Sequence, residues 1–332
     1  MTSWLNIAAR GTLIVSLGIA CWTPAVGCEP ATDDDDAADD DTADDDDWDP
    51  ASVPLAGPCD LADRRGGFVI EAYETYSIVD GTVDDGTVPI SVLDEVAAAG
   101  GCRLMKRNNP FCDPPCGSDE TCDHDGTCIP YPEPIDLGTV TVGGLSAPVS
   151  MEPVMPGYSY FDTSMPHPAF EPMAAVTLRS GGGGLDPFSL RGVGVHELAQ
   201  DGDSWVIEEG QPLVVGWPNP GTPSRSTVDL RLNIDQHGIS PVTVWCEFED
   251  TGAGEIPAAV IDGLFASGVS GFPNGSLSRR TADSVSVGGG CVDLVVASPR
   301  TVDVDVAGYI PCDDDEDCPD GLDCNETTGL CE

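Results

Sequence analysis

The sequence predicts a mainly β protein: a β-sandwich or jelly-roll domain, a small disulfide-stapled α+β unit before it, and two small cystine-rich modules. Apolar and polar residues alternate with a period of two in many short stretches between residues 131 and 311. The turns between these stretches are rich in glycine and proline, of which the chain has 39 and 29. Fourteen cysteines in 332 residues indicate disulfide-stapled modules.

The sandwich domain is expected over residues 131–311. Its clearest strand is TVDLRLNID, in which Val228, Leu230, Leu232 and Ile234 fall on one face and polar residues on the other. Nine or so such strands separated by turns are typical of a sandwich. The other stretches that we expect to be strands are 138–142, 174–179, 189–195, 204–207, 212–217, 241–248, 291–297 and 301–308, and one short helix is expected at 256–266.

Residues 58–110 are expected to form the small α+β unit. Two strands rich in aromatic and β-branched side chains are predicted within residues 67–83. Ile90, Leu93 and Ala97 then recur at helical spacing, between a proline and a pair of glycines, and this spacing predicts a helix.

Four cysteines outside the modules are expected to form two disulfides. Cys59 and Cys102 bracket the α+β unit, and we expect them to pair. Cys246 and Cys291 lie on two predicted strands of the sandwich, and we expect them to bridge those strands.

The two cystine-rich modules are residues 111–130 and 312–332, and each is too small for a hydrophobic core of its own. The second, CDDDEDCPDGLDCNETTGLC, resembles the small disulfide modules of EGF-like and Dickkopf-like extracellular regions. Of three connectivities we favour first-to-third and second-to-fourth pairing. Zinc binding is the alternative, since Cys112 and Cys116 have a zinc-ligand spacing near His124. The module cysteines are Cys112, Cys116, Cys122, Cys128, Cys312, Cys318, Cys324 and Cys331.

Residues 1–27 have the composition of a lipoprotein signal peptide. Arg10 is their only charged side chain, and the apolar core that follows is too short to span a membrane. The small residues before Cys28 resemble the lipobox of bacterial lipoproteins, so we expect a lipid on Cys28. Cys21 is the other candidate, but lipidation of Cys28 and loss of the leader leave an even number of cysteines, which suits an oxidising compartment. A cleaved signal without lipid is a further alternative.

Residues 28–57 are expected to be a disordered, aspartate-rich stalk. Like charges this close together repel one another and keep a segment extended. Weak calcium binding is the alternative, although the run lacks the loop frame of a tight calcium site. The whole chain has 58 acidic and 13 basic residues, and its net charge of −45 argues against nucleic acid as a partner.

The segment 155–173 is the candidate binding loop, because aromatic side chains lie among prolines there. Rigid aromatic rings on a loop can stack against sugar rings, and proline lowers the cost of ordering the loop. The alternative is that these rings fold back as a lid over an open end of the sandwich. The candidate ligand-binding residues are Tyr158, Tyr160, Phe161, His167 and Phe170.

In its layout the chain resembles uncharacterised bacterial surface lipoproteins, with a lipobox, an aspartate stalk, cystine-rich modules and a sandwich. We therefore expect an exported protein, at the bacterial outer membrane or cell surface, that meets the membrane through its lipid. Its expected role is non-catalytic binding or adhesion, to a polysaccharide or a surface protein, or a structural role. No HExxH or GxSxG motif occurs, and no catalytic residue, metal ligand or cofactor is assigned. The alternative is a secreted hydrolase that acts on glycans.

Overall fold

The computed structural model describes residues 48–199, 202, 204–221, 225–234, 241–269, 273–319, 321–325 and 330–331. All of these residues belong to one compact unit, Asp44–Glu332. The predicted signal peptide, the lipid site at Cys28 and most of the aspartate run lie outside the described residues. In the part of the chain that is described, no helix is long and apolar enough to cross a bilayer.

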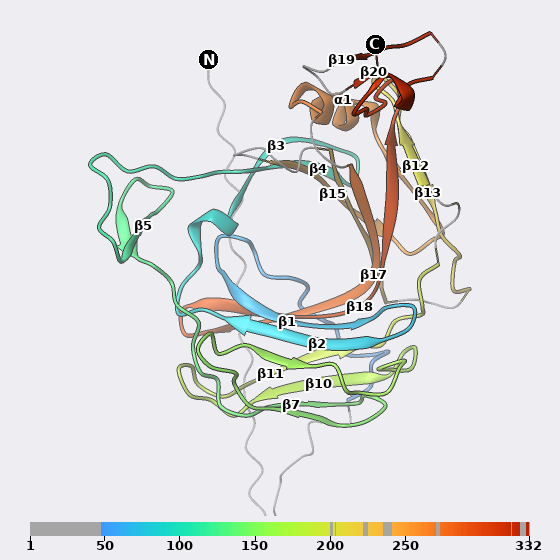
Figure 1. The fold of residues 1–332 in the computed structure, drawn as a ribbon. Helices are drawn as coiled ribbons and strands as arrows, with labels where there is room; N and C mark the ends of the chain where they lie inside the picture. The colour runs from blue at the N-terminus through green and yellow to red at the C-terminus, as the bar shows by residue number, and fades with distance from the viewer. Residues whose placement is uncertain are drawn as a thin grey trace, which may run out of the picture. The chain divides into compact units, whose positions relative to one another are not determined.

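A ten-stranded mixed sheet forms the frame of the fold (Figure 1). Strands β1 and β12 run parallel to β18, and the other neighbours are antiparallel. In spatial order the strands are β3 (Leu93–Ala99), β4 (Cys102–Arg107), β15 (Val242–Glu249), β14 (Thr227–Asn233), β17 (Asn274–Val287), β18 (Gly290–Val306), β1 (Arg64–Ala72), β2 (Ser77–Val83) and β9 (Tyr160–Asp162), and β12 (Ser204–Ile207) pairs with β18 outside this order.

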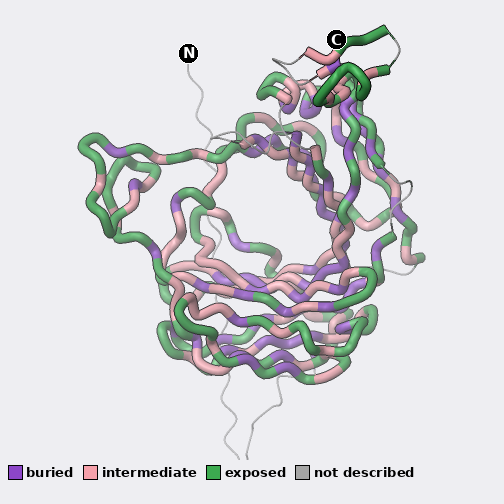
Figure 2. The backbone as a smooth tube through the Cα atoms, in the orientation of Figure 1, coloured by how far each residue is buried: buried purple, intermediate pink, exposed green. Residues whose placement is uncertain are grey.

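Two hydrophobic cores lie against this sheet, and the long hairpin of β17 and β18 contributes to both. In the first core, β1, β2 and the start of β18 pack against a four-stranded sheet of order β11 (Phe188–Val193), β10 (Ala175–Ser180), β7 (Val140–Gly143) and β8 (Val149–Met151). In the second, β14, β15 and the end of β18 are covered by β13 (Leu213–Gly216), β16 (Ala253–Ile256) and helix α1 (Ala258–Ala266). Buried and more exposed residues alternate along many of the strands, which is the pattern of sandwich packing (Figure 2).

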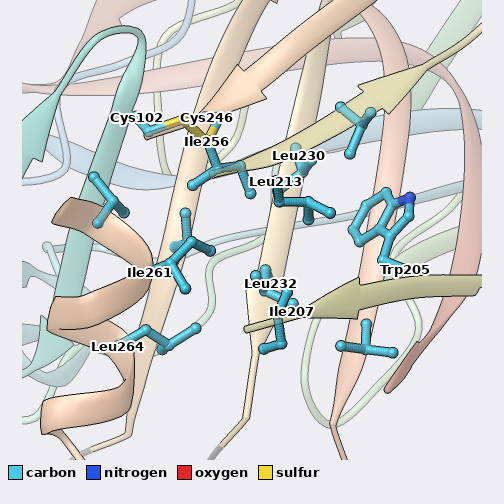
Figure 3. Packing of buried hydrophobic residues seen from close by; sticks show 14 of the residues in the cluster. Cys102, Trp205, Ile207, Leu213, Leu230, Leu232, Cys246, Ile256, Ile261 and Leu264 are labelled. Atoms are coloured by element: carbon cyan, nitrogen blue, oxygen red, sulfur yellow. A yellow bond between two sulfur atoms is a disulfide. The ribbon is translucent and has the colours of Figure 1, made fainter. Parts of the chain in front are cut away.

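The alternation predicted for residues 227–235 is confirmed where the structure describes it. Leu230 and Leu232 of β14 have no exposed surface, and they face Ile256, Ile261 and Leu264, which have none either (Figure 3). Burial of each such side chain stabilises the fold by about 1.5–3 kcal/mol.

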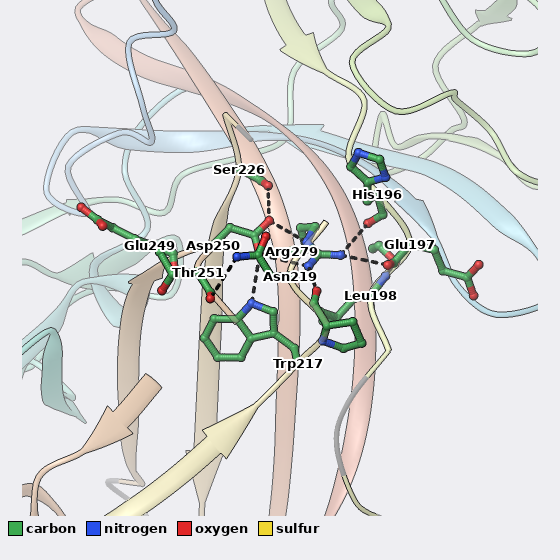
Figure 4. Close-up of polar contacts among 12 residues, drawn as sticks. His196, Glu197, Leu198, Trp217, Asn219, Ser226, Glu249, Asp250, Thr251 and Arg279 are labelled. Atoms are coloured by element: carbon green, nitrogen blue, oxygen red, sulfur yellow. Dashed lines mark hydrogen bonds and ion pairs between the residues drawn. The ribbon is translucent and has the colours of Figure 1, made fainter. Parts of the chain in front are cut away.

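A buried polar network, which we call the arginine hub, lies where β17 passes from one core to the other (Figure 4). Arg279 and Asp250 form its central ion pair, and each side chain is only 2% exposed. The Arg279 guanidinium donates to both carboxylate oxygens of Asp250, at 2.7 and 3.0 Å, and to the backbone carbonyls of Glu197 and Pro218, at 2.9 and 2.8 Å. The hub therefore fixes the irregular segment after β11 against the middle of β17.

Asp250 also accepts hydrogen bonds from Ser226 Oγ at 2.8 Å and from Trp217 Nε1 at 2.9 Å. Burial alone would raise the pKa of Asp250, but the hydrogen bonds from Arg279 and Ser226 and the charge of Arg279 outweigh it, so this pKa is lowered. A buried ion pair with this many partners is costly to break from one side.

The segment predicted as a separate α+β unit is part of the large sheet. Its four strands join this sheet as two hairpins. In one, β1 pairs with β18 and β2 lies on the other side of β1; in the other, β4 pairs with β15 and β3 lies on the other side of β4. The helix predicted from Ile90, Leu93 and Ala97 is wrong: a short 3-10 helix, Pro89–Ser91, is followed by strand β3, which pairs with β4 through a bulge between Glu95 and Ala97. Pairing with a neighbouring strand overrides the local helical spacing here.

The two disulfides predicted outside the modules are also wrong. Cys59 pairs with Cys291, and Cys102 pairs with Cys246. The reason is the strand order, because β1 lies beside β18, and Cys102 of β4 is directly opposite Cys246 of β15.

Both modules have the predicted first-to-third and second-to-fourth connectivity. Each is a two-stranded hairpin, β5 (Glu120–Cys122) with β6 (Cys128–Pro130), and β19 (Cys324–Asn325) with β20 (Leu330–Cys331). The sulfurs that zinc would need are bonded to one another. The pairs are Cys112–Cys122, Cys116–Cys128, Cys312–Cys324 and Cys318–Cys331.

The last part of the predicted stalk is attached to the fold. Trp48 is 8% exposed, its Nε1 donates to Thr177 Oγ1 at 3.2 Å, and Arg191 lies over its ring. Further along, the backbone N–H of Ala56 donates to Asp283 at 2.8 Å. Residues 48–57 of the predicted stalk are therefore part of the folded unit, because an indole ring that is covered by neighbours and has a hydrogen-bond partner is stable when buried.

Candidate functional site

One preformed cavity adjoins the predicted binding loop, and we call it the tyrosine cleft. Its volume is about 220 Å³. It is enclosed by the turn between β1 and β2, the loop between β9 and β10, the strand end after β11, and the middle of β18. The lining residues are Ala72, Tyr73, His167, Pro168, Phe170, Glu171, Pro172, Val195, Glu197 and Ser298.

The first wall is the turn between β1 and β2. The backbone N–H of Tyr73 donates to the carbonyl of Tyr76 at 2.9 Å, and this brings the two rings into a stack with centroids 4.6 Å apart and planes 11° apart. The Tyr73 hydroxyl donates to Glu71 at 2.8 Å. Tyr76 is 52% exposed, so the outer ring of the stack is open to solvent.

Burial changes the proton affinity of this wall. Burial raises the pKa of Glu71, with a smaller opposing effect from the Tyr73 hydroxyl and a further increase from Asp80. The pKa of Tyr73 is raised as well, by burial and by its hydrogen bond to Glu71. The Tyr73 hydroxyl therefore keeps its proton and acts as a donor at neutral pH.

The second wall is the loop that contains His167, which is tied to the first wall. Nδ1 of His167 lies 2.9 Å from Ser77 Oγ, and its Nε2 lies 3.2 Å from the carbonyl of Glu74. Ser77 Oγ also accepts from the backbone N–H of Ala169, and Ser146 Oγ donates to the carbonyl of Pro168 at 2.6 Å. These bonds set the loop in one position before any ligand arrives.

The same part of the chain has two unusual backbone conformations. Among the described residues, the non-glycine residues with positive φ are Tyr158, at 43°, and Met173, at 63°. Each such residue costs on the order of 1 kcal/mol or more and persists only where the surroundings hold it. Met173 is held by its N–H, which donates to the carbonyl of Gly194 at 2.8 Å.

The third wall is formed by Val195 and Glu197, which the arginine hub holds from behind. The Glu197 side chain faces outward and accepts from Arg300 at 2.8 Å. Arg300 is also 3.6 Å from Glu74, and both glutamates are 74% exposed. The rim of the cleft is therefore rich in carboxylates, and the guanidinium of Arg300 is shared between two of them.

The structure brings only part of the predicted set to the cleft. His167 and Phe170 line it, and Phe170 is only 3% exposed because it forms the floor. Tyr160 is a correction, because it has no exposed surface, its hydroxyl accepts from the N–H of Leu137 at 2.8 Å, and its ring is part of the first core. Tyr158 is half-buried and Phe161 is 53% exposed, but neither lines the cleft.

Sequence reasoning missed the stacked tyrosines and the two glutamates of the rim. A signal for Tyr73 and Tyr76 was present, because two aromatic residues flank a short turn where glycine, asparagine or aspartate is usual. Glu171 and Glu197 gave no signal, since exposed glutamates are common in a chain this acidic.

A larger hollow is present, but its chemistry is less suited to recognition. It has about 510 Å³ and is lined by glycines, serines, two aspartates and the Cys59–Cys291 disulfide, without an aromatic side chain. The aspartate-rich turn of the second module is engaged with itself: Asp317 accepts from the backbone N–H of Asp313 at 2.9 Å, and Asp314 caps the turn Asp315–Asp317. Weak calcium binding by the stalk stays a prediction.

Comparison with known proteins gives no family. No family model matches the chain, and no curated protein matches it. Among solved structures the chain is similar to the crystal structure of murine CEACAM1b, with 7% identity, a TM-score of 0.16, and coverage of 73% of this chain and 99% of that one.

Proposed function

We propose that this chain is an exported, lipid-anchored cell-surface protein with a non-catalytic binding role, and that the tyrosine cleft binds a sugar ring of a polysaccharide. The observation that carries this proposal is the stacked pair Tyr73 and Tyr76, of which Tyr73 lines a preformed cavity. The signal-like leader and the lipobox before Cys28 support the export and the anchor.

The chemistry of the cleft suits a sugar ring. Tyr73 lines the cleft, and Tyr76 stacks on it without lining the cleft itself, so the exposed Tyr76 ring can extend this wall and stack on the apolar C–H face of a pyranose. The carboxylates of Glu171 and Glu197 can accept hydrogen bonds from sugar hydroxyls, while Ala72, Phe170 and Val195 offer an apolar floor. The volume of about 220 Å³ is below the range of about 300–1,000 Å³ for pockets that hold drug-sized ligands, so one ring fits better than several.

The rigidity of the cleft also favours binding. Its loop is already tied to Ser77 and Glu74, so a ligand would order few additional groups, and ordering is one of the main costs of association. A polysaccharide presents many copies of the same ring, so even a weak single site gains retention through multivalency on a surface that displays many proteins.

The test is retention on polysaccharides. The oxidised full-length chain is co-sedimented with a panel of insoluble and cross-linked polysaccharides, with and without calcium, and each supernatant is assayed for released sugars. We expect retention without release, and a loss of retention in Tyr76→Ala. Tyr131→Ala is the matched control, because Tyr131 is 55% exposed, does not line the cleft and does not stack on a residue that lines it.

Three outcomes would contradict the proposal. Release of sugars would favour the glycan hydrolase instead. Equal retention of Tyr76→Ala and the wild type would place the site elsewhere. If no polysaccharide retains the protein, its role would instead be binding of a surface protein, or a structural role.

A further inference from the structure

We infer that the tyrosine cleft selects sugars that carry a positive charge, namely amino sugars with a free ammonium group, over neutral and acidic ones. This inference rests on the proposed binding of polysaccharide at the same cleft. It names the ligand class from the charges and rings that surround the cavity.

The charge around the cleft is strongly unbalanced. Two carboxylates line the cleft, those of Glu171 and Glu197, and Glu74 lies next to it, where the guanidinium of Arg300 pairs with both Glu74 and Glu197. Both ring nitrogens of His167 already have partners within the protein, Ser77 Oγ and the carbonyl of Glu74.

Glu171 is the carboxylate that is left for a ligand. It lines the cleft and is exposed, and among the described residues its carboxylate has no hydrogen-bond or ion-pair partner. An ammonium group in the cleft would gain a charge-assisted hydrogen bond there, which is stronger than the neutral bond from a sugar hydroxyl.

The stacked tyrosines point to the same ligand. A cation close to the face of a tyrosine ring is attracted by the ring quadrupole, and Tyr73 lines the cleft while the exposed Tyr76 ring stacks on it. The net charge of −45 attracts cationic polymers over a longer range and repels polymers of uronic acids or sulfated sugars. Rings, local charge and total charge therefore favour the same ligand class.

A matched pair of ligands tests the inference. Glucosamine oligosaccharides and N-acetylglucosamine oligosaccharides of the same length differ only in the charge and acetyl group of the nitrogen. Calorimetric titrations of the full-length chain are made at a pH where the free amines are protonated. We expect the glucosamine oligosaccharide to bind about tenfold more tightly, with a preference that falls as salt rises.

Two variants locate the preference. Glu171→Gln is expected to reduce the preference to about threefold or less, while binding of the N-acetylated oligosaccharide is unchanged. Glu133→Gln is the control, since Glu133 is an exposed glutamate that does not line the cleft, and we expect it to keep the full preference.

The outcomes separate this inference from the proposed function. Equal binding of the two oligosaccharides, or binding of neither while another polysaccharide of the panel is retained, would overturn the charge selectivity and leave polysaccharide binding in place. A preference that survives in Glu171→Gln would overturn the assignment to the cleft. If no polysaccharide is retained at all, the proposed function fails, and this inference fails with it.

Discussion

The arginine hub and the tyrosine cleft share one short segment, residues 195–197, and both contain arginine and carboxylates. In the hub, Arg279 and Asp250 are each 2% exposed and are bonded to partners within the protein. In the cleft, Glu74 and Glu197 are 74% exposed, and Arg300 is shared between them. Charge that is enclosed and fully paired holds the fold, whereas charge at an open rim remains available to a ligand.

The carboxyl pKa shifts of the two regions have opposite directions. In the hub, hydrogen bonds and the charge of Arg279 outweigh burial and lower the pKa of Asp250. At the cleft, burial prevails and raises the pKa of Glu71, because its one side-chain hydrogen bond comes from a neutral hydroxyl. Nearby polar groups alone therefore do not lower the pKa of a buried carboxyl group. The number and charge of the hydrogen-bond donors decide whether its pKa is raised or lowered.

The largest expected effect is loss of stability when the hub is broken. Arg279→Met leaves the carboxylate of Asp250 buried without its cation, and we expect a loss of about 3–5 kcal/mol in the free energy of unfolding. The measurement is chemical denaturation of the oxidised protein. Arg103→Met is the surface control: Arg103 is 53% exposed and lies 4.0 Å from Glu95, so its loss is expected to be about 1 kcal/mol or less. Similar losses in the two variants would remove the distinction between hub and surface.

The next effect is on binding and not on stability. Tyr76→Ala removes the exposed ring of the stack, and we expect polysaccharide binding to weaken about five- to tenfold, in line with about 1 kcal/mol for an aromatic contact. The free energy of unfolding of this variant is expected to stay within about 1 kcal/mol of the wild-type value, as for most surface substitutions. A loss of stability as large as that of Arg279→Met would show that the ring is structural.

The smallest effect is a contrast in pH dependence. The lowered pKa of Asp250 adds stability above the pKa of an unfolded aspartate, and this stability is lost as pH falls through the folded value. Asp250→Asn should therefore differ most from the wild type at neutral pH and least in acid. The raised pKa of Glu71 has the opposite sign, because its stabilisation is present below the unfolded pKa and is lost as pH rises through the folded one.

Glu71→Gln is thus expected to gain stability relative to the wild type as pH rises toward neutral. Chemical denaturation of both variants and the wild type at a series of acidic pH values tests both predicted pH dependences. Parallel pH profiles for Asp250→Asn and Glu71→Gln would contradict the contrast between hub and cleft.

Much of the fold could be predicted from the sequence where one face of a strand is apolar. Within the predicted stretches 227–235 and 301–308, residues 227–233 and 301–306 are strand as predicted, because their valines and leucines alternate with polar residues. Strand β17 was missed for a physical reason. Its core-facing side includes Arg279 and Thr281, which are buried because Asp250 and the backbone of Val193 satisfy their donors. That satisfaction depends on segments far away in the sequence.

The disulfides outside the modules and the site show the same limit. Within a module the cysteines are close in sequence, so their pairing could be predicted, whereas Cys59–Cys291 depends on a parallel pairing of β1 with β18. His167 and Phe170 came from a loop with a recognisable composition. Tyr73 and Glu197 join them only because the sheet brings four separate segments to one cavity.

The measurement that tests the central claim most directly is a spectrum of the tyrosine rings. The chain has six tyrosines, so selective ¹³C labelling of their rings gives six sets of signals, which single Tyr-to-Phe variants assign. With a glucosamine oligosaccharide added, we expect the signals of Tyr73 and Tyr76 to shift, while those of Tyr131, Tyr160 and Tyr309 stay in place. Shifts at Tyr158 or Tyr131 with none at Tyr73 and Tyr76 would contradict the assignment of the ligand site to the tyrosine cleft.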